Sequence, residues 1–346
     1  MAVENDDAGI HERLITFEGR SLDNKVPVEV KRFCYLINFM NSLAPTQGIL
    51  AALWLPTDND GKLWRSALAQ NLAFLKSQGV HGILALGSTG EFPRFELAQR
   101  LEMLATIAEV ADPLPVIANI SDIRPSAVAE LGRAARRLGI PAVAIMAPLV
   151  FPLSQDDLLE HFLHAASSAG LPTLLYNFPE LTGSRIDLET VSAFADRAPL
   201  LGIKQSGREF AYHEPLIRLG REKGFSVFSG ADTRLPEVFA LGASGCIGGL
   251  VNIAPEFMVH LYRVCRERIP GSVTTAFDRL NVVGATIDRL TFPLNVAAGM
   301  QARGLSVGEP KALVSARSRA LYDGIVKDLG ARFAEWGSFS PAGTGG

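Results

Sequence analysis

From Gly48 onward, short apolar runs alternate regularly with longer amphipathic segments, and this alternation restricts the possible fold more than any other feature of the sequence. Several of the short runs, such as Gly82-Ile-Leu-Ala-Leu, are continuously apolar, as expected of parallel strands that are covered on both faces. The alternation predicts βα units around a parallel sheet. The strand-like runs cover residues 48–56, 82–87, 115–120, 142–148, 172–178, 200–206, 225–230 and 245–249.

The segments that follow these runs carry apolar residues at three- and four-residue spacings, which is typical of helices that bury one face. They cover residues 63–78, 95–110, 125–138, 155–169, 188–198, 210–223, 235–241 and 255–268. Strand–helix pairs repeated over roughly 220 residues have the size of a (β/α)8 TIM barrel, an α/β fold. A doubly wound open sheet is the alternative, but no GxGxxG motif follows the first strand.

The predicted barrel occupies residues 47–269, and the segments on either side of it follow other patterns. Residues 1–46 lack the βα alternation and form an N-terminal extension of unknown role. The Gly/Ser/Pro-rich residues 339–346 are expected to be a flexible tail. Residues 270–338 predict a C-terminal helical region, with helices at 273–290, 294–302 and 310–329.

Composition excludes several classes of protein. Hydrophobic residues make up 48% and charged residues 20% of the chain, and its net charge of −3 gives no reason to expect a nucleic-acid partner. Cys34, Cys246 and Cys265 are widely spaced and form no CxxC pair, so neither a disulfide framework nor a zinc site is expected. No apolar run reaches the roughly 18 residues of a membrane span, and a cytoplasmic protein without membrane contact is predicted.

In a barrel of this kind the functional site lies at the C-terminal ends of the strands, and Lys204 is the most informative residue there. It ends the apolar run Leu200-Leu-Gly-Ile-Lys, whereas the other seven lysines lie in polar or helical surroundings. Burial lowers the pKa of a lysine towards that of a nucleophilic amine, and such lysines form Schiff bases with carbonyl substrates. From position alone, a strand-end lysine paired with a carboxylate is an equally good interpretation.

Two other strand ends carry polar groups suited to the same chemistry. Tyr176 ends the fifth strand, next to the strand of Lys204, where its phenol could transfer protons; simple packing is the alternative. Gly87-Ser-Thr-Gly-Glu follows the second strand, where backbone N–H groups and the hydroxyls of Ser88 and Thr89 could hold a carboxylate. A tight turn whose hydroxyls cap the next helix is the alternative there. Together the three positions supply what a 2-keto acid lyase needs.

These motifs, in this order and spacing, resemble those of the dihydrodipicolinate synthase / N-acetylneuraminate lyase superfamily of class I aldolases. The resemblance covers residues 48–249. It implies that Lys204 forms an imine with a 2-keto acid substrate, that Tyr176 is the acid/base, and that no metal or organic cofactor is needed. It also implies a homo-oligomer, commonly a tetramer. The motifs are Gly87-Ser-Thr-Gly-Glu, Tyr176-Asn-Phe-Pro-Glu-Leu-Thr-Gly and Gly202-Ile-Lys-Gln-Ser.

The same resemblance assigns the substrate-binding residues. Ser88 and Thr89, with Gly87 beside them, would hold the keto acid carboxylate, and Ser206 would line the same site. The sequence Gly230-Ala-Asp-Thr resembles a substrate-hydroxyl loop of the sugar-acid branch, so Gly230 and Asp232 would contact a polyol tail. An exposed loop aspartate without this role is the alternative for Asp232.

Two positions depart from the family pattern. Leu181 stands where dihydrodipicolinate synthases have an arginine that holds a substrate carboxylate, and a leucine cannot make that contact. The sugar-acid branch is therefore favoured over true dihydrodipicolinate synthase. Val150 stands where many members have an aromatic residue that reaches into a neighbouring subunit's site, so the proton relay must differ.

The leading hypothesis is an aldolase that cleaves a 2-keto-3-deoxy sugar acid, or an N-acetylneuraminate-like substrate, to pyruvate and an aldehyde. The alternatives are a Schiff-base dehydratase, a dihydrodipicolinate synthase and a non-catalytic binding descendant. His161 and His164 lack a third ligand and are interpreted as surface residues, not as a metal pair. Glu91 is interpreted as a carboxylate that complements the dipole of the helix it precedes.

Overall fold

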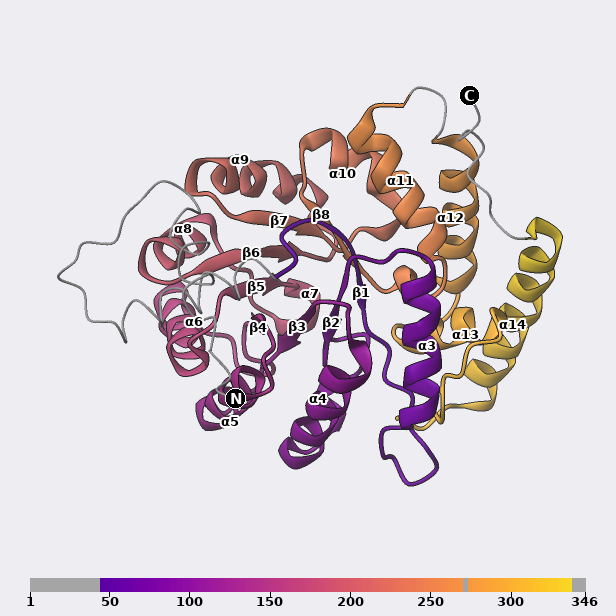
Figure 1. The fold of residues 1–346 in the computed structure, drawn as a ribbon, viewed down its shortest axis with the longest axis horizontal. Helices are drawn as coiled ribbons and strands as arrows, with labels where there is room; N and C mark the ends of the chain where they lie inside the picture. Colours follow the sequence, from indigo (N-terminus) through magenta and orange to yellow (C-terminus); the bar gives the residue numbers. More distant parts are fainter. Residues whose placement is uncertain (1–43, 270–272, 338–346) are drawn as a thin grey trace, which may run out of the picture. The chain divides into compact units, whose positions relative to one another are not determined.

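The structure, a computed structural model, describes residues 44–269 and 273–337. The predicted extension, apart from residues 44–46, and the predicted tail lie outside the described residues. Within the described part, parallel strands close into a barrel in the order of the chain (Figure 1). They are β1 (Gly48–Ala52), β2 (Gly82–Ala85), β3 (Val116–Asn119), β4 (Ala142–Met146), β5 (Thr173–Asn177), β6 (Leu200–Gln205), β7 (Ser226–Ser229) and β8 (Gly245–Gly248).

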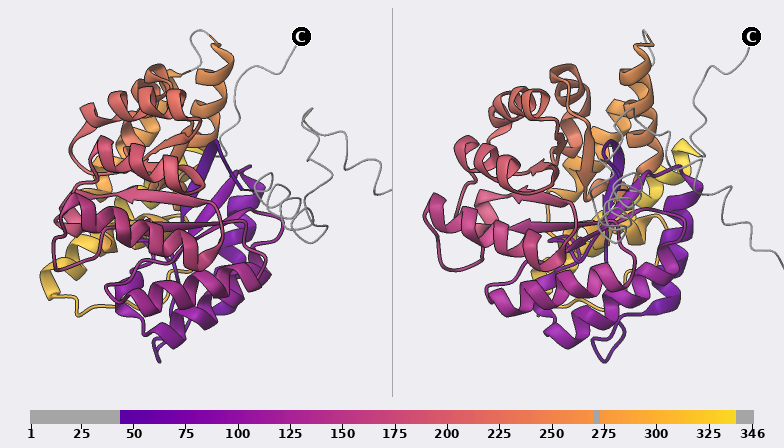
Figure 2. Two further views of the ribbon diagram at one scale, coloured as in Figure 1. Left: turned by 90° about the vertical axis from the view of Figure 1, so that its left-hand side faces the viewer. Right: turned by 60° about the vertical axis from the view of Figure 1, so that its left-hand side comes forward.

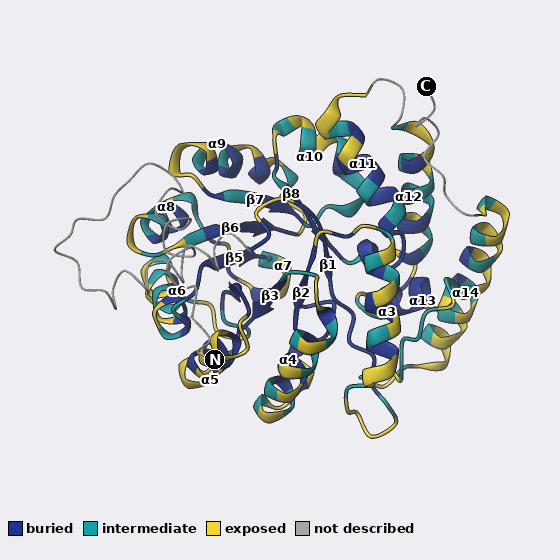
Figure 3. Ribbon diagram, viewed as in Figure 1, coloured by how far each residue is buried: buried dark blue, intermediate teal, exposed yellow. Residues whose placement is uncertain are grey.

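Closure of the sheet is visible in the pairing of β1, which is hydrogen-bonded to both β2 and β8. The prediction of a (β/α)8 barrel is therefore confirmed, and the open-sheet alternative is wrong. The strand residues are buried almost throughout (Figure 3), because the barrel interior covers one face of each strand and the helices cover the other.

A helix follows each strand and packs outside the barrel, as the two further views in Figure 2 show. The observed helices match the predicted segments, except that the segment predicted over 210–223 begins with a 3-10 turn, η2 (Phe210–Tyr212). The helices are α3 (Arg65–Ser77), α4 (Leu97–Ala111), α5 (Pro125–Arg137), α6 (Gln155–Ala169), α8 (Leu188–Arg197), α9 (His213–Lys223), α10 (Leu235–Leu241) and α11 (Pro255–Glu267).

Short helical turns lie directly after several strands, at the end of the barrel where the site was predicted. Among them are η1 (Phe92–Arg94), α7 (Pro179–Thr182), η3 (Asp232–Arg234) and η4 (Leu250–Asn252). Because they follow the C-terminal ends of β2, β5, β7 and β8, they surround the mouth of the barrel.

After the barrel come α12 (Thr274–Ile287), α13 (Leu294–Ala302) and α14 (Ala316–Trp336). In Figure 1 they lie beside α11 and α3, and α13 packs against α14. The helix predicted over 310–329 is displaced. The backbone N–H of Glu309 donates to the carbonyl of Thr57, which holds the chain extended there, and Ser315 then caps α14 by accepting from the N–H of Ser318.

Candidate active site

The register between β5 and β6 places Tyr176 directly opposite Lys204. The amine of Lys204 donates a hydrogen bond of 3.0 Å to the phenol oxygen of Tyr176, and the Lys204 Nζ lies 4.1 Å from the centroid of the same ring. Both side chains are buried. Lys204 forms no salt bridge within the described residues, so the alternative of a lysine held by a carboxylate is wrong.

Ser88 extends this contact to the end of a third strand. Its hydroxyl lies 2.9 Å from the hydroxyl of Tyr176, so Lys204, Tyr176 and Ser88 form one connected chain of polar groups. Tyr176 therefore does more than pack in the core, because its hydroxyl is hydrogen-bonded to both Lys204 and Ser88. The capping alternative for Ser88 and Thr89 is also wrong, because the N-cap of η1 is Glu91 and the N-cap of α4 is Glu96.

The turn after β2 has an unusual backbone. Leu86 and Glu91 adopt left-handed conformations, with φ of 55° and 60°, which non-glycine residues seldom do. A Cβ added to Gly90 would lie 3.0 Å from the carbonyl oxygen of Leu53, so only glycine lets the turn approach the segment after β1 this closely. Backbone strain of this kind is typical of functional sites.

Glu91 holds this turn through its side chain, which corrects the prediction that it only complements a helix dipole. Its carboxylate accepts hydrogen bonds from Arg94 Nε at 2.6 Å and from Lys311 Nζ at 3.3 Å. The Lys311 side chain is 4% exposed and its Nζ lies 3.8 Å from the centroid of a Trp54 ring. Burial lowers the pKa of Lys311, and the charge of Glu91 opposes that shift.

Lys311 is therefore a second buried lysine, which the sequence did not reveal. It stands in a short polar stretch, Glu309-Pro-Lys, with no periodic apolar residues around it. Its burial depends on Trp54 and Glu91, which lie more than 200 residues earlier in the chain, so no local pattern could have indicated it.

Asp232 is half-buried and lines the cavity at the barrel mouth, so it is not the exposed residue of the alternative, and its contact with a polyol tail stays a prediction. Its carboxylate accepts from the backbone N–H of Leu250 at 2.8 Å and from the Cys246 thiol at 3.4 Å. A Cβ on Gly248 would clash with that carboxylate, so glycine leaves the space it occupies. Burial raises the pKa of Asp232, although the Leu250 N–H and the charge of Lys204 act in the opposite direction.

Gly230 lets two predicted site residues lie side by side. A Cβ at this position would clash with the hydroxyl of Ser206 and would lie 3.3 Å from Cε of Lys204. The backbone N–H of Gly230 donates to the carbonyl of Gln205, which fixes the end of β7 against the end of β6. The close approach of these strand ends therefore depends on the absence of a side chain at Gly230.

The structure brings most of the predicted site residues to one cavity of about 320 Å³ at the barrel mouth. Gly87 lies in the same turn as Ser88, but it does not line the cavity. The residues predicted from the sequence that do line it are Ser88, Thr89, Tyr176, Lys204, Ser206, Gly230 and Asp232.

Part of the cavity wall comes from the helices after the barrel, and sequence reasoning missed it. We call it the C-terminal wall. No motif identified these residues, because helical spacing alone does not show which side chains of these helices face the mouth of the barrel. The C-terminal wall consists of Gly284, Ile287, Asp288, Phe292, Asn295 and Val296.

Four other residues weighed in the sequence lie away from the cavity. Val150 has a φ of 78° and is 74% exposed, an outlier for a β-branched residue, and Leu181 on α7 is 39% exposed. His164 is exposed as predicted, and its Nε2 lies 3.0 Å from the carbonyl of Pro125. His161 is half-buried, and burial lowers its pKa to about 4.

The described residues contain no group of three or more His, Cys, Asp or Glu side chains arranged as metal ligands. None of the helices within 44–269 and 273–337 combines the length and the apolar character that a membrane crossing requires.

Comparison with known proteins gives a consistent result. The model of the dihydrodipicolinate synthetase family matches residues 45–327. A 4-hydroxy-tetrahydrodipicolinate synthase from Methanosphaerula palustris is 32% identical over 269 residues, 76% of this chain and 91% of that protein. A probable 2-dehydro-3-deoxy-D-pentonate aldolase from Escherichia coli is 30% identical over 66% of this chain and 76% of its own. A solved structure of an E. coli prophage protein of the dihydrodipicolinic acid synthase family, in complex with pyruvate, has a TM-score of 0.76 at 25% identity, covering 83% of this chain and 99% of that one.

Proposed function

The chain belongs to the dihydrodipicolinate synthetase family, whose members are lyases, and from this premise we propose that it is a class I aldolase that cleaves a 2-keto-3-deoxy sugar acid to pyruvate and an aldehyde. The observation that carries the proposal is the hydrogen-bonded chain from Lys204 through Tyr176 to Ser88. It joins a buried amine, a phenol and a hydroxyl at the ends of three different strands, which is the set of groups that imine chemistry requires.

The first step is formation of the imine. The neutral amine of Lys204 attacks the keto carbon, and the resulting carbinolamine loses water to leave a protonated imine. Tyr176, within hydrogen-bond distance of Lys204, supplies the proton that the departing hydroxyl needs. The substrate carboxylate lies beside Ser88 and Thr89, where hydroxyl and backbone N–H groups can donate to it.

Cleavage follows from the same geometry. A base removes the proton of the C4 hydroxyl, the C3–C4 bond breaks, and its electron pair moves into the imine to give an enamine while the aldehyde leaves. Protonation of the enamine at C3 and hydrolysis of the imine then release pyruvate and restore Lys204. Tyr176 is the group placed to carry these protons, and Ser88 connects it to the carboxylate end of the substrate.

Two observations favour a sugar acid over the dihydrodipicolinate synthase substrates. Leu181 stands at the position where the synthases carry an arginine for a second substrate carboxylate. One relative is named a probable 2-dehydro-3-deoxy-D-pentonate aldolase. We also propose that the protein is cytoplasmic and a homo-oligomer, by family resemblance a tetramer. Exposed apolar side chains support the oligomer: Ile123, in the loop after β3, is 51% exposed, and Val150 and Phe151, in the loop after β4, are 74% and 68% exposed.

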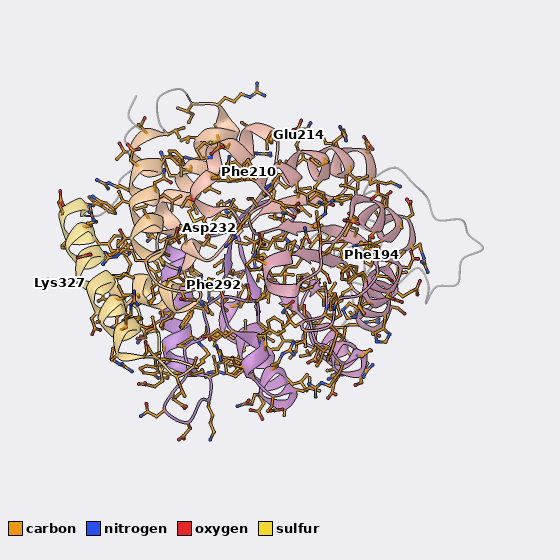
Figure 4. The ribbon with its side chains drawn as sticks, turned by 180° about the vertical axis from the view of Figure 1, so that it is seen from behind. Phe194, Phe210, Glu214, Asp232, Phe292 and Lys327 are labelled. Atoms are coloured by element: carbon orange, nitrogen blue, oxygen red, sulfur yellow. The ribbon has the colours of Figure 1, made fainter. Side chains whose placement is uncertain are left out.

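Borohydride trapping with pyruvate, read by peptide mass spectrometry, tests the proposal. A pyruvate-sized adduct on the Lys204 peptide is expected, together with a fall in kcat of about 10⁴-fold or more in Lys204→Ala. Lys327→Ala, which removes an exposed lysine of α14 (labelled in Figure 4), is the matched control and should keep both the adduct and the activity. An adduct on Lys311 instead of Lys204, or no adduct with pyruvate or larger keto acids, would contradict the mechanism.

Product analysis separates cleavage from dehydration. An aldolase gives pyruvate and an aldehyde from a 2-keto-3-deoxy sugar acid, whereas a dehydratase expels water and keeps the carbon chain intact. Detection of an intact-chain product without pyruvate would replace the aldolase by the dehydratase and leave the role of Lys204 unchanged.

A further inference from the structure

The cavity has two walls of different chemical character. One is built by the strand ends and holds the reactive groups, and the other is the C-terminal wall defined above. In Figure 4, Asp232 from the first wall and Phe292 from the second lie near one another in the middle of the view. A substrate bound to Lys204 must therefore extend its tail between these two sets of side chains.

The balance of charge in the cavity is one-sided. Among the described residues that line it, Lys204 is the only basic one, and Asp232 and Asp288 are acidic. In the protonated imine the positive charge of Lys204 stays on the imine nitrogen, next to the substrate's own carboxylate. No arginine, histidine or further lysine in the described lining is then left to pair with a second negative charge on the substrate.

Asn295 supplies the second observation. It is only 6% exposed and lines the cavity, yet its Oδ1 is buried without a hydrogen-bond partner in the described part of the chain. Buried polar groups in proteins are nearly always hydrogen-bonded, and one that is not requires an explanation. The oxygen itself is covered by neighbouring atoms, but the residue lines the cavity, and a neutral amide there is suited to a hydroxyl group, which can both donate and accept.

The remaining residues of the C-terminal wall are apolar or small. Phe292 is partly exposed and offers an aromatic face to the C–H groups of a sugar chain. Gly284 lies so close to Thr233 that a Cβ there would clash with the threonine methyl group, so the two walls are already in close contact at this point. The space for a tail is therefore bounded by an amide, an aromatic ring and two carboxylates.

We propose that the C-terminal wall selects substrates whose aldehyde portion is an uncharged polyol and excludes tails that carry a phosphate or a second carboxylate. This inference rests on the proposed aldolase function and narrows its substrate class. Asn295 hydrogen-bonds a hydroxyl of the tail. Asp232, half-buried at the mouth, and Asp288, exposed at the rim, repel an anionic tail that finds no cation to pair with.

Two aldehydes with the same carbon chain test the proposal in the direction of aldol addition. The protein is supplied with pyruvate and either glyceraldehyde or glyceraldehyde 3-phosphate. For each aldehyde, kcat/KM is measured from formation of the aldol product. A preference of at least about 100-fold for glyceraldehyde is expected. Equal rates, or a preference for the phosphate, would overturn the proposal.

Three variants locate the selectivity. Asp288→Lys should lower the preference about tenfold by raising the rate with the phosphate. Asp278→Lys makes the same charge change at an exposed position of the same helix that does not line the cavity, and it should leave the preference unchanged. Asn295→Ala should raise KM for glyceraldehyde about tenfold while pyruvate trapping at Lys204 stays as in the wild type.

Pyruvate trapping on the same samples distinguishes a failure of the proposed function from a failure of the proposed selectivity. If no adduct forms on Lys204, the proposed function fails, and the selectivity proposal fails with it. If the adduct forms and the two aldehydes react equally well, or Asp278→Lys changes the preference as much as Asp288→Lys, only the role of the C-terminal wall is overturned.

Discussion

The two walls of the cavity differ in how completely their polar groups are satisfied before any ligand arrives. At the strand ends, Lys204, Tyr176 and Ser88 are joined by hydrogen bonds of 2.9 to 3.0 Å. In the C-terminal wall, the Asn295 oxygen has no partner among the described residues. Groups that must act on every substrate in the same way are preorganised by one another. The Asn295 side chain lines the same cavity without such a partner for its oxygen.

Among variants that test this difference between the two walls, Tyr176→Phe is expected to have the largest effect, on kcat. Removal of the phenol breaks the chain between Lys204 and Ser88, so kcat should fall by about 10² to 10³-fold while KM for pyruvate changes little. The measurement is steady-state kinetics together with the rate of borohydride-trapped adduct formation. Tyr212→Phe is the control, because that buried hydroxyl donates only to the carbonyl of Ile186 and its loss should leave kcat unchanged. Equal losses of kcat in both variants would show that the effect is structural.

Lys311→Met is expected to have the next largest effect, on stability. It leaves the carboxylate of Glu91 without one of its two partners in a buried position, which should lower the free energy of unfolding by about 2 kcal/mol. Urea denaturation measures this loss. Lys223→Met breaks the exposed pair with Asp196 and should cost no more than about 0.5 kcal/mol. If the two variants lose the same amount, the turn after β2 is not held by Lys311.

A smaller effect is expected from Ser88→Ala. Loss of one neutral hydrogen bond to Tyr176 corresponds to about 1 kcal/mol, so kcat/KM for the keto acid should fall about fivefold. Ser229→Ala provides the comparison, because the Ser229 hydroxyl accepts from the backbone N–H of Ala231 and does not line the cavity. An unchanged kcat/KM in Ser88→Ala would remove Ser88 from the preorganised wall.

The smallest effect is expected from Asp232→Asn. Because the pKa of Asp232 in the folded protein is above its ordinary value, the folded state binds this proton more tightly than the unfolded chain does. The residue therefore destabilises the fold above its folded pKa and ceases to do so as the pH falls towards 3.8. Asp232→Asn should equal or slightly exceed the wild type in urea denaturation at pH 7, and the difference should shrink at lower pH. A large loss of stability at pH 7 would mean that the ionised carboxylate holds η3 and η4 in place.

The barrel and its reactive cluster could be predicted because both are recorded locally in the sequence. Each strand is a short apolar run, and Lys204, Tyr176 and Ser88 each follow or end one of those runs. Once a closed parallel barrel is assumed, the C-terminal strand ends must meet at one place. The position of a residue along its own strand then suffices to predict its neighbours.

The C-terminal wall and the pair between Glu91 and Lys311 could not be predicted in this way. Both depend on how the helices after residue 273 dock on the barrel, and helical spacing gives the buried face of a helix without naming its partner. The extended segment before α14 is fixed by the hydrogen bond from the Trp54 indole to the carbonyl of Val307 and by the pairing of Gly308 with Thr57. These contacts join residues about 250 positions apart, and no local pattern encodes them.

The contact between Glu91 and Lys311 also has a consequence for how the protein is made. The two residues are 220 positions apart, so the turn after β2 leaves the ribosome long before the side chain that secures it. A chain interrupted after β8 contains Lys204 and the strands of the barrel, but neither Lys311 nor Asn295. Such a fragment contains Lys204 without the residues of the C-terminal wall. The cavity around Lys204 is therefore complete only after residues 284–296 have been synthesised.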